Sequence, residues 1–245
     1  MYALSAFKTY DIRGVWQSEI DAQFGRIMGY ALGLHLIEKY GAPKILISSD
    51  VREANMILID EFLKGIKTAG ITQVTVIGKD EKIPQYTYGV CSTPMAYYAA
   101  IDRFDCACLF TASHNPSEYV GAKIVDNKCL SIKSTELRAL FEGQAQTEIA
   151  DTGLPEIIPY TDTKITELLA GIQEKFKTLQ KIPKITIDYS HGAASHFEQE
   201  FLREILGENA VHIFTNPDGS FPAHDTDTSR FANYKPLIAE IQKNG

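Results

Sequence analysis

The segment with the clearest chemical potential is residues 111–116, which read TASHNP. A serine hydroxyl such as that of Ser113 is a possible nucleophile, and the imidazole of His114 beside it can exchange protons near neutral pH. The segment directly follows residues 106–110 (CACLF), an apolar run typical of a buried strand. Ligands of open α/β sheets bind at the carboxyl ends of the strands. The order of strand and loop therefore predicts a site here, although the same polar residues are also typical of a simple turn.

Two further segments carry groups that suit a phosphate or a carboxylate. Residues 10–14 (YDIRG) supply the planar guanidinium of Arg13 and a glycine that lets the backbone approach a ligand. Residues 121–123 (GAK) supply Lys123, which could serve as a base or bind a phosphate. Taken alone, each has a simpler interpretation: an Asp–Arg pair beside a glycine is a common surface salt bridge, and a lone lysine is usually solvated.

Composition limits the class of protein. The 24 Lys and Arg residues against 31 Asp and Glu give a net charge of −7, with no basic stripe, so we expect no nucleic-acid binding. No apolar run approaches the roughly 20 residues that cross a bilayer, and the amino terminus has no export signal. We therefore expect a cytoplasmic protein without membrane contact. The four cysteines are expected to be buried thiols rather than disulfides or metal ligands.

Helical and strand patterns alternate along the chain and must position these segments. In the first half, short apolar runs predict strands at residues 44–47, 74–78 and 106–110. Apolar residues at 3.6-residue spacing predict helices at residues 24–32, 56–66 and 134–141, and a further helix is expected to begin at residue 93. A hairpin-like stretch covers 122–132. Strand, helix and strand with glycine between them are typical of a βαβ unit and hence of a parallel sheet.

The same alternation of strands and helices is predicted again after residues 146–159, a polar stretch that we interpret as a linker. The second half predicts strands at 184–188 and 211–214 and helices at 165–179, 197–205 and 234–242. We therefore expect two consecutive three-layer α/β domains with mainly parallel, mixed sheets, at residues 1–145 and 160–245. The second is expected to be incomplete, because the chain ends where the plan requires another strand.

Together these segments resemble the α-D-phosphohexomutase family. The tyrosine–aspartate form of residues 10–14 most resembles its phosphomannomutase/phosphoglucomutase branch. The resemblance spans the whole chain and is supported by further motifs, namely residues 50–52 (DVR), 92–94 (STP), Asp188 with 192–193 (GA), and 217–222 (PDGSFP).

The resemblance implies a reversible transfer of phosphate between O1 and O6 of a hexose phosphate. Ser113 would carry the phosphate as a phosphoserine, and a hexose 1,6-bisphosphate would be the intermediate and activator. Mg²⁺ would bind to the phosphate of Ser113 and to an aspartate loop. The resemblance also implies that His114 and Lys123 handle the hydroxyl proton, and which of the two is the general base stays open. Arg13 and Asn115 would steady the loop and the phosphate. Tyr10 would line the sugar pocket.

Two departures from the family pattern change this expectation. Val120 stands where the family usually has asparagine, and the aspartate-rich metal loop is missing before Gly245. Residues 225–227 (DTD) are more typical of turn contacts than of a metal loop. We therefore interpret the chain as an amino-terminal fragment of a mutase that is inactive alone. A non-catalytic sugar-phosphate-binding or scaffold module, and another mutase such as phosphoglucosamine mutase, are the alternatives; mannose or glucose preference and oligomeric state stay open.

Overall fold

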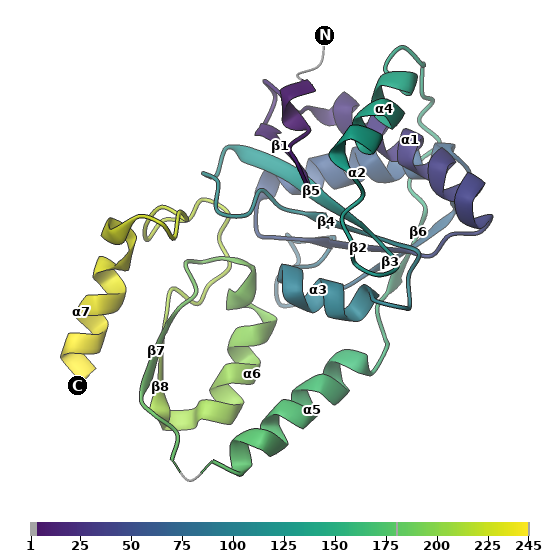
Figure 1. Cartoon of the computed structure of the whole chain (residues 1–245). Helices are drawn as coiled ribbons and strands as arrows, with labels where there is room; N and C mark the ends of the chain where they lie inside the picture. Colours follow the sequence, from purple (N-terminus) through teal and green to yellow (C-terminus); the bar gives the residue numbers. More distant parts are fainter. Residues whose placement is uncertain (1–3, 180, 245) are drawn as a thin grey trace.

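A computed structural model describes residues 4–179 and 181–244 and contains two α/β units (Figure 1). Within these residues, the first unit contains a six-stranded sheet in the order β1-β5-β4-β2-β3-β6. Its strands are β1 (Ile12–Val15), β2 (Ile45–Ser49), β3 (Gln73–Val76), β4 (Cys106–Phe110), β5 (Tyr119–Asp126) and β6 (Glu156–Pro159). β5 is antiparallel to both of its neighbours, whereas β4, β2, β3 and β6 are parallel to one another.

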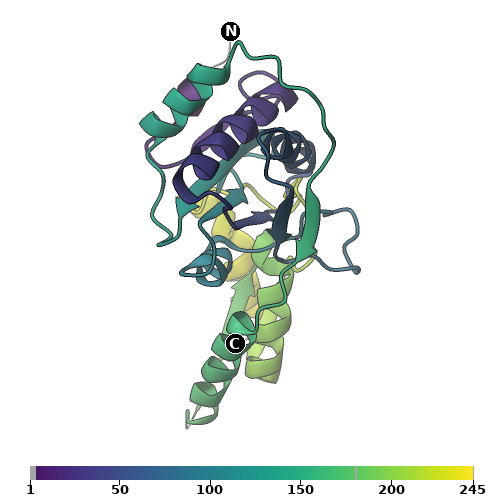
Figure 2. The same ribbon diagram turned by 90° about the vertical axis from the view of Figure 1, so that its right-hand side faces the viewer.

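Helices cover both faces of this sheet (Figures 1 and 2). One face packs against α1 (Ala22–Tyr40), α2 (Glu53–Thr68) and α4 (Ser134–Gln144), and the other against α3 (Thr93–Ala100) and the first turn of α5 (Lys164–Lys177). Successive side chains of β4 alternate between the two cores: Cys108 and Phe110 pack toward α1 and α2, whereas Ala107 and Leu109 pack toward α3. All of β4 is buried, as expected of a central strand with helices on both sides.

Glycines allow α1 and α2 to pack with their backbones in contact. A Cβ atom on Gly29 would lie 2.0 Å from the carbonyl oxygen of Phe62, and one on Gly65 would lie 2.1 Å from that of Arg26. Neither backbone oxygen can move without shifting its helix. The pair therefore fixes how closely α1 and α2 approach each other above the sheet.

Replacing Gly65 by alanine is expected to lower the free energy of unfolding by about 1–3 kcal/mol, because the added methyl group overpacks this contact. Gly143 provides the matched control, since it lies in α4 with no atom within 4 Å of an added Cβ. Gly143→Ala should be neutral or stabilise by up to about 1 kcal/mol. Urea unfolding followed by the fluorescence of Trp16, the single tryptophan, measures both. Equal effects of the two substitutions would contradict the close packing.

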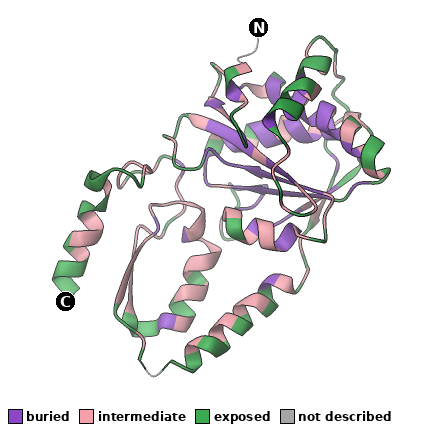
Figure 3. Cartoon of the chain, viewed as in Figure 1, coloured by how far each residue is buried: buried purple, intermediate pink, exposed green. Residues whose placement is uncertain are grey.

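The second unit contains the parallel pair β7 (Ile185–Asp188) and β8 (Ala210–Ile213), joined through α6 (Phe197–Leu206), with α7 (Lys235–Asn244) against β7. This βαβ arrangement was predicted from the sequence. Figure 3 shows that burial is concentrated in the first unit. Among the described residues after 160, the buried ones are Ile165, Tyr189, Ser195, Leu206 and Gly219. Short 3₁₀ segments complete the fold at Leu4–Ala6, Ala193–Ser195, Gly207–Asn209 and Phe231–Tyr234.

The α/β class with a mainly parallel, mixed sheet is confirmed, but the predicted linker at 146–159 is partly wrong. Its last four residues form β6, which pairs in parallel with β3 at the edge of the first sheet. Polar neighbours and two prolines hid this strand, because its partner is distant in the sequence. The division into two domains stays a proposal, with the boundary now after Pro159 rather than after residue 145.

Candidate active site around Ser113

Ser113 lies in the loop between β4 and β5, at the carboxyl end of β4, as the sequence predicted. Its φ angle of 58° is in the left-handed region, which is sparsely populated by residues other than glycine. The side chain is exposed, and Oγ lies 3.3 Å from Nδ1 of His114. The N–H of Ser113 donates to Oγ1 of Thr111 at 2.9 Å. The hydroxyl is therefore presented to solvent with an imidazole next to it, while the backbone behind it is fixed.

Arg52 holds this loop from the inside. It lies between β2 and α2, as the N-cap residue of α2, and its side chain is only 1% exposed. The guanidinium forms an ion pair with Asp50 at 3.1 Å. It also donates to the carbonyl oxygens of Ser113 (3.1 Å), Asn115 (2.6 Å), Pro116 (2.5 Å) and Tyr119 (2.9 Å). A planar, always-charged fork is suited to bind several oxygens at once, so one side chain fixes most of the loop.

Asp50 links the same arginine to the residues beside Ser113. Its Oδ2 accepts from the hydroxyl of Thr111 at 2.7 Å, and its Oδ1 accepts from Nδ2 of Asn55 at 2.8 Å. Since Thr111 in turn accepts from the N–H of Ser113, a continuous, partly buried network joins the end of β2, α2 and the loop. In the sequence, residues 50–52 (DVR) stood out only as a supporting motif of the family resemblance. Its position directly after a strand adjacent to β4 is the signal that could have marked it.

Arg13, Asn115 and Lys123 come together on one side of the sheet. The Arg13 guanidinium pairs with Asp11 at 2.6 Å and donates to Oδ1 of Asn115 at 3.1 Å. Arg13 lies opposite Gly121 in the register of β1 and β5, so Lys123 is the next residue of β5 on the same face. Diagonal neighbours of this kind are about 7–8 Å apart, within reach of one phosphate.

Lys123 is partly buried on the α3 side of the sheet, opposite Leu109. Among the described residues, its ammonium group has no hydrogen-bond or ion-pair partner. A cation in this position can receive an anionic ligand without first breaking a salt bridge. Tyr10, by contrast, is 72% exposed, and within the described part of the chain its side chain makes no hydrogen bond or ring contact with the Ser113 loop.

The second unit reaches this loop through the segment after β8. The hydroxyl of Thr226 donates to the carbonyl oxygen of His114 at 2.7 Å. Asp225 and Asp227 on either side of it make local contacts: Asp225 accepts from the N–H of Asp227, and Asp227 accepts from Ser229 and Arg230. The prediction of turn contacts is confirmed for Asp225 and Asp227, whereas Thr226 between them contacts the Ser113 loop.

The residues around Ser113 do not form a metal site on their own. Across residues 4–179 and 181–244, no group of three or more His, Cys, Asp and Glu side chains is arranged to hold a metal ion. Asp188, the last residue of β7 in the second unit, pairs with Nε2 of His224 at 3.0 Å. The described residues therefore do not fit the ligand set that the family resemblance implies for Mg²⁺. Within the same residues, no helix has both the length and the apolar character needed to span a membrane.

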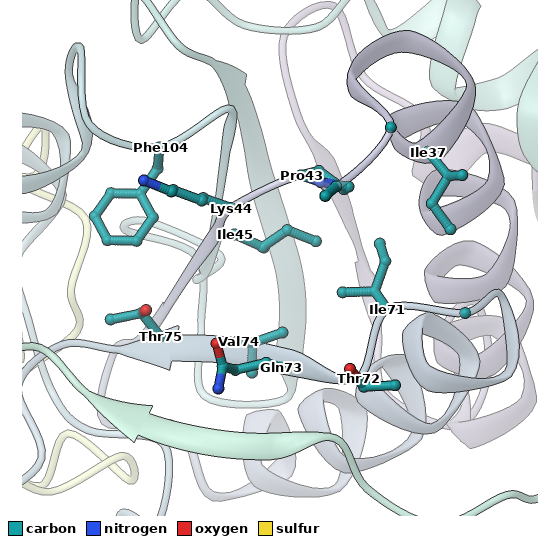
Figure 4. A pocket seen from close by; sticks show the side chains of 13 residues that line it. Ile37, Pro43, Lys44, Ile45, Ile71, Thr72, Gln73, Val74, Thr75 and Phe104 are labelled. Carbon is teal, nitrogen blue, oxygen red and sulfur yellow. The ribbon is translucent and has the colours of Figure 1, made fainter.

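A cavity of about 530 Å³ lies elsewhere, at the amino ends of β2 and β3 (Figure 4). Its lining includes Lys44, Gln73 and Phe104. In a parallel sheet this edge is opposite to the carboxyl ends of the strands, where Ser113 lies. The cavity is therefore separate from the candidate active site.

The chain is similar in sequence to known phosphoglucomutases and phosphomannomutases. Residues 4–148 match the family described as phosphoglucomutase/phosphomannomutase, alpha/beta/alpha domain I. The chain is 31% identical to a phosphomannomutase of Methanocaldococcus jannaschii, over 98% of this chain and 50% of that protein. It is 28% identical to a phosphomannomutase/phosphoglucomutase of Pseudomonas putida, over 98% and 48% respectively. The chain therefore belongs to the phosphoglucomutase/phosphomannomutase family.

The solved structures give the same result. A family member from Burkholderia thailandensis superposes with a TM-score of 0.78 and 26% identity, over 99% of this chain and 51% of that one. A protein from Thermus thermophilus has the same fold, with a TM-score of 0.72 and 22% identity, over 98% and 52%. The chain spans about half the length of the curated relatives it matches.

Proposed function

We propose that this chain carries the phosphoserine site of a phosphomannomutase/phosphoglucomutase, which moves phosphate between O1 and O6 of a hexose phosphate. The observation that supports this most is the presentation of Ser113. Its hydroxyl is exposed beside an imidazole, on a loop whose carbonyl oxygens are bound by the buried Arg52. A residue that accepts and returns a phosphoryl group needs this combination of access and a fixed backbone.

The proposed chemistry uses residues that the structure brings together. When a sugar hydroxyl attacks the phosphorus of phosphoserine, the bond between phosphorus and Oγ of Ser113 breaks. Oγ then gains a proton, and His114 at 3.3 Å is placed to donate it. Lys123 would stabilise charge on the moving phosphoryl group or take the proton of the sugar hydroxyl. Arg13 and Asn115, joined at 3.1 Å, would bind the phosphate from the side of β1.

Mg²⁺ and hexose 1,6-bisphosphate belong to the proposal as cofactor and activator. Of the described residues, Ser113 alone is assigned to the metal, through its phosphate, and a bound Mg²⁺ would offset the charge on the phosphoryl group. Tyr10, three residues before Arg13 and 72% exposed, is proposed to line the sugar pocket. We also propose that the protein acts in the cytoplasm on small hexose phosphates.

Turnover of glucose 1-phosphate or mannose 1-phosphate in the presence of Mg²⁺ and a hexose 1,6-bisphosphate tests this function. We expect the complete gene product to turn over within the usual enzyme range of about 1–10³ s⁻¹. The 245 residues assayed by themselves are expected to show no measurable turnover, because they leave the metal ligands incomplete. Binding of hexose phosphates without turnover by the complete gene product would favour the non-catalytic module instead.

A further inference from the structure

The segment after β8, residues 217–226, is seated on the Ser113 loop and on Arg52; we call it the clamp segment. Gly219 contacts the first unit most closely, because an added Cβ would lie 2.2 Å from the carbonyl oxygen of Val51 and 2.9 Å from Cα of Arg52. The hydroxyl of Tyr86 donates to the carbonyl oxygen of Pro217 at 3.4 Å. Figure 1 shows this yellow-green segment between β8 and α7, on the side of the second unit that faces the first sheet.

Phe221 covers the guanidinium of Arg52. The Cζ atom of Arg52 lies 5.1 Å from the centroid of the Phe221 ring, a cation–π contact on a desolvated arginine. Phe221 has a φ angle of 51°, which is a genuine outlier for a bulky side chain and persists only where the surroundings hold it. The ring also packs beside the buried side chains of Val51, Tyr86 and Val90. The strained backbone therefore places an aromatic face on the arginine that holds the loop.

Thr226 binds the same loop from the other side. Its hydroxyl lies 2.7 Å from the carbonyl oxygen of His114 and 3.2 Å from that of Asn115. Arg52 already binds the Asn115 oxygen at 2.6 Å from inside the protein. The backbone on both sides of His114 is thus held between a side chain of the first unit and a side chain of the second.

We propose that the clamp segment positions the phosphate carrier: Phe221 and Thr226 act through Arg52 and the loop carbonyls to keep Ser113 in its left-handed conformation. The proposal rests on the proposed function only for the role of Ser113. Neither residue is assigned to the reacting atoms, so both are positioning residues. The Ser113 hydroxyl is then presented to the substrate only when the second unit is packed against the first.

Amide hydrogen exchange on the 245-residue chain tests the clamp without any need for activity. The amides of Ser113, Asn115 and Tyr119 are all hydrogen-bonded within the loop. In Phe221→Ala we expect them to exchange about tenfold faster or more, because local opening of the loop becomes easier. The matched control is Phe231→Ala, at a side chain of the same unit that is 73% exposed. It should leave these amides unchanged.

Thr226→Val and Thr226→Ser separate positioning from general loss of structure. Valine keeps the shape but removes the donor, and should also speed exchange at Ser113 and Asn115; serine restores the donor and should restore protection. Amides of β2 and of β7–β8 should exchange as in the parent chain. Unchanged exchange at Ser113 in both Phe221→Ala and Thr226→Val would overturn the proposal. Faster exchange of β7–β8 together with the loop in Thr226→Val, unrescued by serine, would also overturn it.

Turnover of the complete gene product gives the second readout. Phe221→Ala and Thr226→Val should lower kcat by about tenfold with little change in KM, since misplacement of the carrier affects the chemical step. If the parent protein shows no turnover, the proposed function fails while the exchange result still decides the clamp. If the parent turns over and kcat of both variants equals that of the parent, the clamp fails and the proposed function stands.

Discussion

Replacing Lys123 by alanine is expected to lower kcat of the complete gene product by about 10²–10⁴-fold, with a much smaller change in KM. The reason is the position of Lys123 on the same face as Arg13, with an ammonium group that no described residue pairs with. A group that acts on the moving phosphoryl group or on the hydroxyl proton contributes mainly in the transition state. Steady-state kinetics with glucose 1-phosphate and mannose 1-phosphate measure the effect.

Lys128 provides the control for this experiment. It lies a few residues further along, is 61% exposed and pairs with Asp102 at 2.5 Å. Lys128→Ala should leave both kinetic constants close to those of the parent. Near-normal turnover of Lys123→Ala would show that Lys123 takes no part in the reaction and is a solvated surface residue, as a lone lysine usually is.

Replacing Arg52 by methionine is expected to lower the free energy of unfolding by about 3–5 kcal/mol. Methionine fills much of the volume but leaves the Asp50 carboxylate and four loop carbonyl oxygens without their common donor. Removing one partner of a buried ion pair is far more damaging than replacing both. Urea unfolding monitored by Trp16 fluorescence reports on the unit that contains Arg52.

Arg138→Met is the matched control, because Arg138 is 47% exposed on α4 and, among the described residues, pairs only with Glu142 in the neighbouring turn. An exposed pair of this kind contributes at most about 1 kcal/mol. A loss for Arg52→Met as small as that for Arg138→Met would show that Arg52 does not organise the loop.

The parts of the fold with strong local signals could be predicted from the sequence. The buried strand β4 and the helices α1 and α2 carry their pattern within their own residues, and the position of Ser113 after β4 follows from it. β1 and β6 could not be predicted in the same way. β1 is four residues long and was interpreted only as a motif, and β6 depends on pairing with β3, which local sequence does not reveal.

The candidate site was predictable to a similar extent. Ser113, His114 and Lys123 could be proposed because their side chains have obvious chemistry, and Arg13 because it adjoins a glycine motif. The contact between Arg13 and Asn115 joins residues far apart in the chain, and nothing local predicts it. The proposed roles of Phe221 and Thr226 could not be predicted for a further reason. These roles come from contacts between the two units, whereas the residue types suggest only packing and a turn.

The central claim is that Ser113 is the phosphate carrier, and locating the phosphate tests it most directly. The complete gene product should be incubated with glucose 1,6-bisphosphate and Mg²⁺, and then examined by intact mass and peptide mapping, beside Ser113→Ala as the control. We predict one phosphoryl group per chain, located on Ser113, and none on the variant. Reproducible phosphate on Ser117 or Thr111 instead, or equal labelling of the parent chain and Ser113→Ala, would contradict the assignment.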